Sequence, residues 1–163
     1  MFGFGKKSTS VDLQAPFAGE AVPVTEVPDP VFSGKMLGEG YAVIPRDDAP
    51  SLTVCAPAAG TLTTVFKTGH AFAVTTAEGL DALVHPGLAT VELKGEGFTV
   101  LAAQGQTVAA GQPVIEVDLS LRREKGRNPV TPVVMSNKKQ VGSISLATGQ
   151  VAQGDVTATV TLA

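Results

Sequence analysis

Short runs of β-branched and apolar residues, each closed by glycine, proline or asparagine, follow one another along almost the whole chain. Examples of such runs are TVCAPAAGTLTTVFKTG, QPVIEVDL, NPVTPVVMSN and ATVTLA. The 18 glycines and 11 prolines leave little room for long helices. Short strands at this spacing predict an all-β sandwich or barrel. A helical turn is expected only at SLRREKGR, residues 120–127, which lacks an apolar stripe and is expected on the surface.

Two pairs of similar segments suggest that one strand unit is duplicated. APFAG at 15–19 recurs as APAAG at 56–60, and GQTVAAGQPVIEV at 105–117 resembles GQVAQGDVTATV at 149–160. Two copies are too few for a solenoid. They fit a pseudo-symmetric sandwich, while chance similarity in a chain rich in glycine, alanine and valine is the alternative explanation.

Length and composition bound the organisation and the location. The chain of 163 residues is expected to form a flexible N-terminal tail over 1–12 and a single domain over 13–163. The tail has two phenylalanines and two lysines but no apolar run of signal-peptide length, so at most weak contact with a membrane surface is expected. The single Cys55 suits a reducing compartment, and a cytoplasmic location is expected. A net charge of −3 without a basic patch argues against nucleic acid as a partner.

Both histidines of the chain lie in HAFAVTTAEGLDALVHP, residues 70–86. The turn signal TAEG between two apolar runs predicts a β-hairpin. With the turn centred between its alanine and glutamate, Thr75 lies opposite Leu80 and His70 lies opposite His85. Side chains directly opposite each other have Cβ atoms about 5 Å apart, so the two imidazoles are expected to touch. A slip of one residue in the register would instead place them on opposite faces.

Both faces of this predicted hairpin are mostly apolar. The face of His70 is expected to carry Thr68, Phe72 and Val74, the face of His85 carries Leu83, and the remaining positions are small and apolar. One face can pack into the core, which leaves an apolar patch around the histidines. Exposed apolar patches on proteins usually mark sites of partner contact.

Two adjacent imidazoles allow several chemistries. A zinc site needs three or four ligands, and the sequence has no third histidine. An aspartate or glutamate could complete such a site, but nothing in the spacing demands it, so no metal is expected. The pair can act as general acid and base, or one ring can be a nucleophile while the other donates a hydrogen bond to the group received. The alternative is that both are ordinary half-buried histidines.

Three stretches resemble the glucose-type enzyme IIA domain of the bacterial phosphoenolpyruvate-dependent sugar phosphotransferase system. They are VPDPVFSGKMLGEGYAVIP at 27–45, KTGHAFAV with LVHPGLATVELKGEGF at 67–98, and GQTVAAGQPVIEVDLSLRREKGRNPVTPVVMSN at 105–137. The resemblance implies an antiparallel β-sandwich with an internally duplicated strand motif. It also implies a phosphoryl carrier that works without a cofactor. The carrier takes the group from the phosphohistidine of the carrier protein HPr and passes it to a cysteine of an enzyme IIB domain.

The resemblance also implies roles for particular residues. His85 matches the phosphoacceptor, His70 the imidazole that stabilises the phosphoryl group, and Thr68 the hydroxyl that supports His70. A ring used by both partners matches Val31, Phe32, Phe66, Leu83 and Val91, with an acidic residue at Asp29. The alternative within the family is a regulator that binds its targets according to its phosphorylation state, with weak or no transfer activity.

Two residues depart from the pattern of this family, and two other functions are alternatives. Pro86 removes a backbone donor that a central strand would miss, and Ala89 replaces a carboxylate that the family places near its active site. A biotinyl or lipoyl carrier domain would need an exposed lysine at a hairpin tip, typically beside methionine, and no such lysine is expected in this chain. A zinc peptidase on a related sandwich would need an H-x-H pair, which is also missing.

Overall fold

The computed structural model describes residues 9–46, 49–88, 96–124 and 128–163. Its strands are β1 (Ser10–Gln14), β2 (Gly19–Pro23), β3 (Gly40–Pro45), β4 (Ser51–Cys55), β5 (Gly60–Val65), β6 (Phe72–Thr75), β7 (Asp81–Val84), β8 (Phe98–Val100), β9 (Thr107–Val108), β10 (Pro113–Asp118), β11 (Thr131–Met135), β12 (Val141–Leu146), β13 (Gly149–Val151) and β14 (Val156–Leu162). Its helices are η1 (Val24–Glu26), α1 (Pro30–Ser33), α2 (Leu119–Glu124) and η3 (Lys138–Gln140). No helix within these ranges is long and apolar enough to cross a bilayer.

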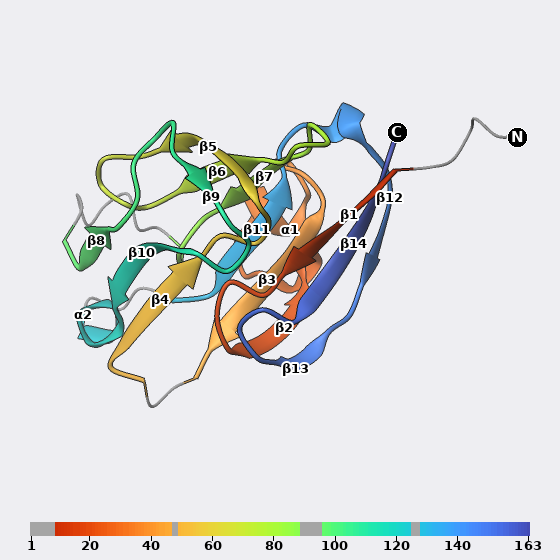
Figure 1. Cartoon of the computed structure of the whole chain (residues 1–163). Coiled ribbons are helices and arrows are strands. Elements are labelled where there is room, and N and C mark those ends of the chain that lie inside the picture. The colour runs from red at the N-terminus through yellow and green to blue at the C-terminus, as the bar shows by residue number, and fades with distance from the viewer. Residues whose placement is uncertain (1–8, 47–48, 89–95, 125–127) are drawn as a thin grey trace, which may run out of the picture.

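The strands form two small sheets and one large sheet. The small sheets have the orders β1-β14-β12 and β4-β10-β8, and the large one has the order β13-β2-β3-β11-β7-β6-β5-β9. Figure 1 shows β1 beside β14 and β4 beside β10. All three sheets contribute side chains to one core cluster, among them Leu13 of β1, Ile115 of β10 and Tyr41 of β3. The strand pairings are antiparallel throughout the described ranges, which confirms the predicted all-β antiparallel sandwich.

The two Ala-Pro-x-Ala-Gly motifs meet across a local two-fold axis. The N–H of Gln14 donates to the carbonyl of Pro57 at 2.8 Å, and the N–H of Cys55 donates to the carbonyl of Pro16 at 3.0 Å. Each motif therefore makes the same contact to the other. A reciprocal pair of this kind shows a structural repeat rather than a chance similarity.

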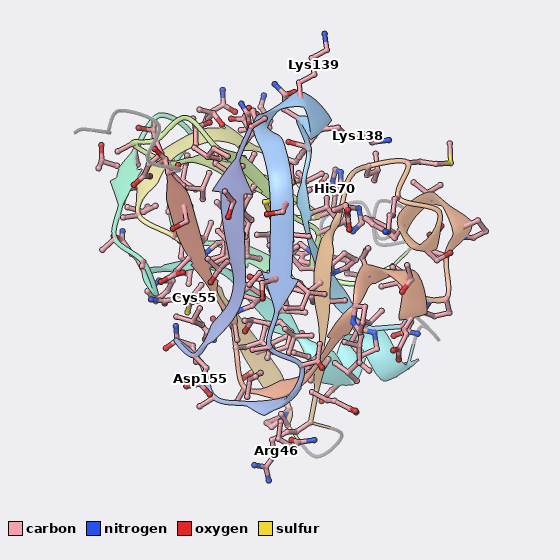
Figure 2. All side chains as sticks on the ribbon, turned by 90° about the vertical axis from the view of Figure 1, so that its right-hand side faces the viewer. Arg46, Cys55, His70, Lys138, Lys139 and Asp155 are labelled. Atoms are coloured by element: carbon pink, nitrogen blue, oxygen red, sulfur yellow. The ribbon has the colours of Figure 1, made fainter. Side chains whose placement is uncertain are left out.

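The second pair of similar segments follows the same symmetry. The N–H of Ala15 donates to the carbonyl of Asp155 at 2.8 Å, and the N–H of Ala56 donates to the carbonyl of Gln112 at 2.9 Å. Figure 2 labels Cys55, which takes part in the first pair of contacts, and Asp155, which takes part in the second. The order of the large sheet repeats the symmetry, because β13, β2 and β3 on one side correspond to β9, β5 and β6 on the other. The predicted duplication is confirmed.

The chain joins the sheet earlier than the predicted boundary of the tail. Ser10, Val11 and Asp12 pair with β14, and Val11 is buried in the core. The alternation of Val11 with Leu13 explains this, because both side chains reach the core face of β1. The predicted end of the tail at residue 12 is therefore wrong, and residues 1–8 lie outside the described residues. At the predicted helix, α2 begins at the fully buried Leu119, which anchors it to the core cluster.

The hairpin of β6 and β7 forms, but its register differs from the predicted one by one residue. Thr75 pairs with Asp81 rather than Leu80. The N–H of Gly79 donates to the carbonyl of Thr76, and Gly79 has φ +94°. A turn of this kind, followed by a glycine in the left-handed region, makes a three-residue loop instead of a two-residue one. The extra residue moves the register.

One half of the outer face of the large sheet is covered. The connection between β2 and β3 brings Val24, Val27 and Phe32 against Ala42 of β3 and Val134 of β11, and these residues belong to a second buried cluster. On the other half, the outward side chains of β6 and β7 are only half-buried. His70 precedes β6 and His85 follows β7, so both histidines lie at the same end of this hairpin.

Candidate active site

His85 follows directly after the central strand β7. Its N–H donates to the carbonyl of Pro132 at 3.0 Å, which continues the ladder toward β11. Its Nδ1 lies 2.6 Å from the carbonyl oxygen of Gly87. A carbonyl oxygen only accepts hydrogen bonds, so Nδ1 carries the proton and Nε2 of the neutral ring keeps its lone pair. Pro86 lies beyond the end of β7, so the predicted loss of a ladder hydrogen bond inside the strand is wrong.

His70 is held by the tight turn between β5 and β6. The N–H of Gly69 donates to the carbonyl of Phe66 at 2.8 Å, and Gly69 has φ +77°. The hydroxyl oxygen of Thr68 lies 2.5 Å from Nδ1 of His70. Burial lowers the pKa of His70, because the desolvated ring disfavours the charged form. His70 is therefore a neutral imidazole near pH 7, with its outer nitrogen Nε2 opposite the bond to Thr68.

The two imidazoles lie together, with ring centroids 5.8 Å apart and an angle of 66° between the ring planes. Regular pairing of β6 with β7 would put them on opposite faces, because the observed register pairs Phe72 with Val84. β6 begins only at Phe72, and the turn at Gly69 takes His70 out of the alternation of the strand. The predicted proximity is confirmed, although the register from which it was argued is wrong.

The predicted sharing of faces needs the same correction. Phe72 and Val74 are fully buried in the core and do not share the face of His70. They point inward together with Ala82 and Val84, because the shifted register puts these four side chains on one face.

Aromatic rings flank each imidazole. Phe66 lies 4.5 Å from His70 between ring centroids and is 42% exposed. Phe32 lies 5.4 Å from His85 in an edge-on contact but is only 4% exposed. Phe32 therefore contacts the imidazole of His85 from the interior of the protein and contributes little exposed surface. Val31, next to it on α1, is 40% exposed.

The other predicted contact residues have different positions. Leu83 is half-buried and packs against the second buried cluster. Asp29 is the N-cap of α1, and its Oδ1 accepts the N–H of Val31 at 3.0 Å. Pro30 at the first helical position suits such a start, because no N–H is needed there. Val91 and Ala89 lie outside the described residues.

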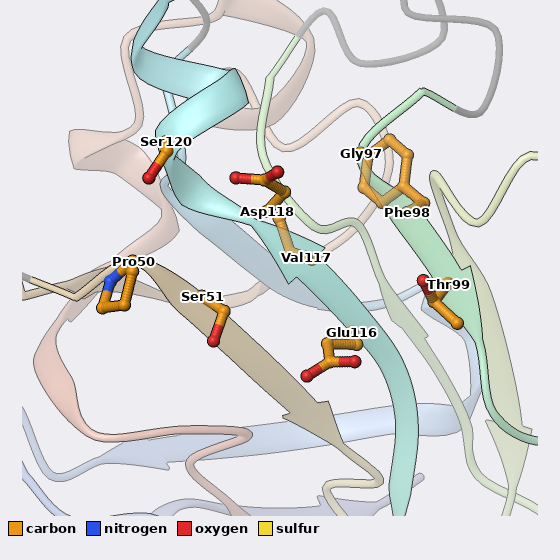
Figure 3. A pocket seen from close by; sticks show the side chains of 9 residues that line it. All are labelled: Pro50, Ser51, Gly97, Phe98, Thr99, Glu116, Val117, Asp118 and Ser120. Carbon is orange, nitrogen blue, oxygen red and sulfur yellow. The ribbon is translucent and has the colours of Figure 1, made fainter.

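A pocket of the described chain lies away from the two histidines. It has a volume of about 510 Å³ and is lined by Pro50, Ser51, Gly97, Phe98, Thr99, Glu116, Val117, Asp118 and Ser120. Figure 3 shows the carboxylates of Glu116 and Asp118 on β10, and neither histidine takes part. Within the described part of the chain, no three histidine, cysteine, aspartate or glutamate side chains gather in a way that could hold a metal ion.

Sequence reasoning missed two features that shape the site. The carbonyl of Gly87 is a main-chain group and has no signature in the sequence. The helix α1, by contrast, has a readable signal, because aspartate followed by proline is a typical helix start. α1 matters here because it carries Val31 and Phe32.

Comparisons with known proteins show the family of the chain. Residues 11–141 match the family described as phosphoenolpyruvate-dependent sugar phosphotransferase system, EIIA 1. The chain is 42% identical over 149 residues to the PTS system glucose-specific EIIA component of Haemophilus influenzae, covering 91% of this chain and 87% of that one. It is 46% identical over 134 residues to the PTS system mannose-specific EIIBCA component of Corynebacterium glutamicum, covering 82% of this chain and 19% of that one.

A solved structure is similar over nearly its full length. Glucose permease IIA from Mycoplasma capricolum superimposes with a TM-score of 0.84 at 35% identity, covering 98% of this chain and 99% of that one. The similarity in sequence and that in structure therefore point to the same family. The chain belongs to the EIIA 1 family of the phosphoenolpyruvate-dependent sugar phosphotransferase system and is a phosphoryl carrier of that system.

Proposed function

We propose that Nε2 of His85 accepts a phosphoryl group from the phosphohistidine of HPr and passes it to a cysteine of an enzyme IIB domain. The observation that carries this proposal is the 2.6 Å hydrogen bond between Nδ1 of His85 and the carbonyl of Gly87, beside a second imidazole. The bond fixes the tautomer in which Nε2 has the lone pair that a nucleophile needs.

The two transfers balance in bonds and charge. In the first, the Nε2 lone pair attacks phosphorus while the P–N bond of the donor breaks, and its electron pair returns to the donor histidine. The Nδ1 proton stays on His85, and the Gly87 carbonyl stabilises the positive charge that the phosphorylated ring gains. In the second, the thiolate of the acceptor attacks phosphorus and the electron pair of the P–N bond returns to Nε2.

His70 stabilises the phosphoryl group as a neutral hydrogen-bond donor. When the Thr68 hydroxyl donates to Nδ1, the single proton of the neutral ring resides on Nε2. That N–H can then donate to a phosphoryl oxygen on the neighbouring His85. The lowered pKa of His70 supports this role, because the ring is neutral before the dianionic group arrives.

The surrounding apolar side chains form the docking surface for both partners. Val31, Phe66 and Leu83 carry the exposed or half-exposed part of it in the described chain, and Phe32 supports His85 from below. The carboxylate of Asp29 belongs to the proposed surface, and Val91, which lies outside the described residues, is proposed as a further member of it. Exclusion of water by these side chains protects a phosphohistidine from hydrolysis.

The partner of the second transfer is the enzyme IIB domain of a membrane sugar permease. A relative from Staphylococcus carnosus is named a glucoside-specific EIICBA component, and the one from Corynebacterium glutamicum is an EIIBCA component. These names join an A domain to a B domain in one chain. We place the carrier in the cytoplasm, with at most weak membrane-surface contact through its N-terminal tail, and expect the rest of the chain to be a single domain that unfolds in one transition.

The proposal is tested by the isomer of phosphohistidine that forms. Wild-type protein is phosphorylated with phosphoenolpyruvate, enzyme I and HPr, and the linkage is read from phosphorus–nitrogen couplings by NMR on histidine-labelled protein. We expect phosphorus on Nε2 of His85. Phosphorus on Nδ1, or on His70, would contradict the proposal. Phosphorylated protein that gives nothing to a IIB domain would instead favour the regulatory function.

A further inference from the structure

The loop whose carbonyl group accepts the Nδ1 proton of His85 is hydrogen-bonded to the segment that leads into β11. Gly87 supplies the carbonyl that accepts from Nδ1 of His85. The next residue, Leu88, donates its N–H to the carbonyl of Asn128 at 2.9 Å, and the N–H of His85 donates to the carbonyl of Pro132. Residues 85–88 are thus bound on both sides of Gly87 to residues 128–132.

The side chain of Asn128 shapes that segment. Its Oδ1 accepts the N–H of Val130 at 3.0 Å, which closes an asparagine turn around Pro129. Val130 is only 3% exposed, so its N–H needs an acceptor inside the protein. The hydroxyl of the buried Thr131 donates to the carbonyl of Pro129 and tightens the same bend. Without Oδ1 the bend must open to bring another acceptor to Val130, and the carbonyl of Asn128 moves with it.

We propose that Asn128 is a positioning residue that sets the tautomer of His85. The chain of contacts runs from Oδ1 of Asn128 through its turn to the N–H of Leu88, and from there to the carbonyl of Gly87 and Nδ1 of His85. Loss of the turn displaces the Gly87 carbonyl, and the proton of the neutral ring is then shared with Nε2. A protonated Nε2 cannot attack phosphorus. This inference rests on the proposed function of Nε2.

The variant Asn128→Ala tests the inference, with Asn137→Ala as a matched control. Oδ1 of Asn137 accepts the N–H of Lys139 at 3.2 Å, so the control removes the same kind of bond at the other end of β11. The tautomer of His85 is read from two-bond nitrogen–proton correlations of the neutral ring in each protein. The rate of phosphorylation by phospho-HPr is measured on the same samples.

We expect wild type and Asn137→Ala to keep the proton on Nδ1 of His85, while Asn128→Ala shows it shared between the two nitrogens. Phosphorylation of Asn128→Ala should be about fivefold slower, the effect of about one lost hydrogen bond. Asn128→Ser should restore tautomer and rate, because its hydroxyl can accept from the same N–H without adding charge.

An unchanged His85 tautomer in Asn128→Ala would overturn the inference, as would an equal change in Asn137→Ala. The tautomer measurement needs no phosphoryl donor. A wild-type protein that accepts no phosphoryl group would therefore overturn the proposed function, while the comparison of tautomers still decides the role of Asn128.

Discussion

Replacing Thr68 by valine tests the proposed role of His70 in stabilising the phosphoryl group. The substitution removes the hydroxyl that lies 2.5 Å from Nδ1 of His70 and keeps nearly the same side-chain shape. The ring of Phe66, 4.5 Å away between centroids, still packs against the imidazole. His70 therefore keeps its place but loses the group that fixes its tautomer. A fraction of its rings then carries the proton on Nδ1 and offers no donor at Nε2.

The size of the effect follows from that one hydrogen bond. A net contribution of about 0.5–1.5 kcal/mol corresponds to a rate that is about two- to thirteenfold lower, where the bond matters in the transition state. The loss should fall on transfer to the IIB domain. The unphosphorylated site needs no donor from His70 to keep the Nε2 lone pair of His85, since Gly87 holds that tautomer.

Single-turnover transfer from the purified phosphoprotein to a IIB domain, followed by rapid quenching, measures this rate directly. Thr68→Ser should regain the wild-type rate, because it keeps the hydroxyl. Thr63→Val is the matched control, because the hydroxyl of Thr63 lies 3.2 Å from that of Thr75 and does not contact an imidazole in any hydrogen bond of the described residues. Wild-type rates in Thr68→Val would contradict the proposed effect of the Thr68 hydroxyl on His70, as would an equal loss in Thr63→Val.

Two further predictions concern the turn and the charge of His70. Gly69→Ala should destabilise the fold by more than the roughly 1 kcal/mol cost of a left-handed residue, because its Cβ would lie 2.8 Å from Cβ of Phe98. Gly79→Ala, also at positive φ but with open space around it, should lose less in urea unfolding monitored by circular dichroism; equal losses would contradict this. NMR titration should give a His70 pKa below 6.5, and the pKa should rise once a phosphoryl dianion sits on His85. Because the folded pKa is lowered, the contribution of His70 to stability is present above pH 6.5 and is lost as the pH falls through the folded pKa; a folded pKa above 6.5 would contradict this.

The architecture was readable because it depends on repeated local signals. Alternating β-branched residues and turn glycines predict strands, and the two Ala-Pro-x-Ala-Gly motifs predict the duplication that Gln14 and Cys55 then complete with reciprocal bonds. The register of the hairpin could not be predicted from the sequence to within one residue. Two- and three-residue loops differ only in whether Gly79 belongs to the loop, and the same letters allow both.

The histidine pair was predicted, but the reason for its proximity was not. The turn at Gly69, which has a positive φ and packs closely against Phe98, brings His70 beside His85 against the alternation of the strands. The carbonyl of Gly87 could not be found from the sequence, because every residue has a carbonyl and only the packing of the loop selects one. Phe32 was expected on the surface, yet its burial against His85 follows from α1 folding over the sheet.

We propose that His85 carries the phosphoryl group, and intact-mass spectrometry can show whether it does. Wild type, His85→Ala and His70→Ala are each incubated with phosphoenolpyruvate, enzyme I and HPr. We expect wild type to gain the mass of one phosphoryl group, in a linkage that acid breaks as a nitrogen–phosphorus bond should. We expect His85→Ala to gain nothing and His70→Ala to gain the same group as wild type. A gain in His85→Ala, or none in wild type, would contradict the account.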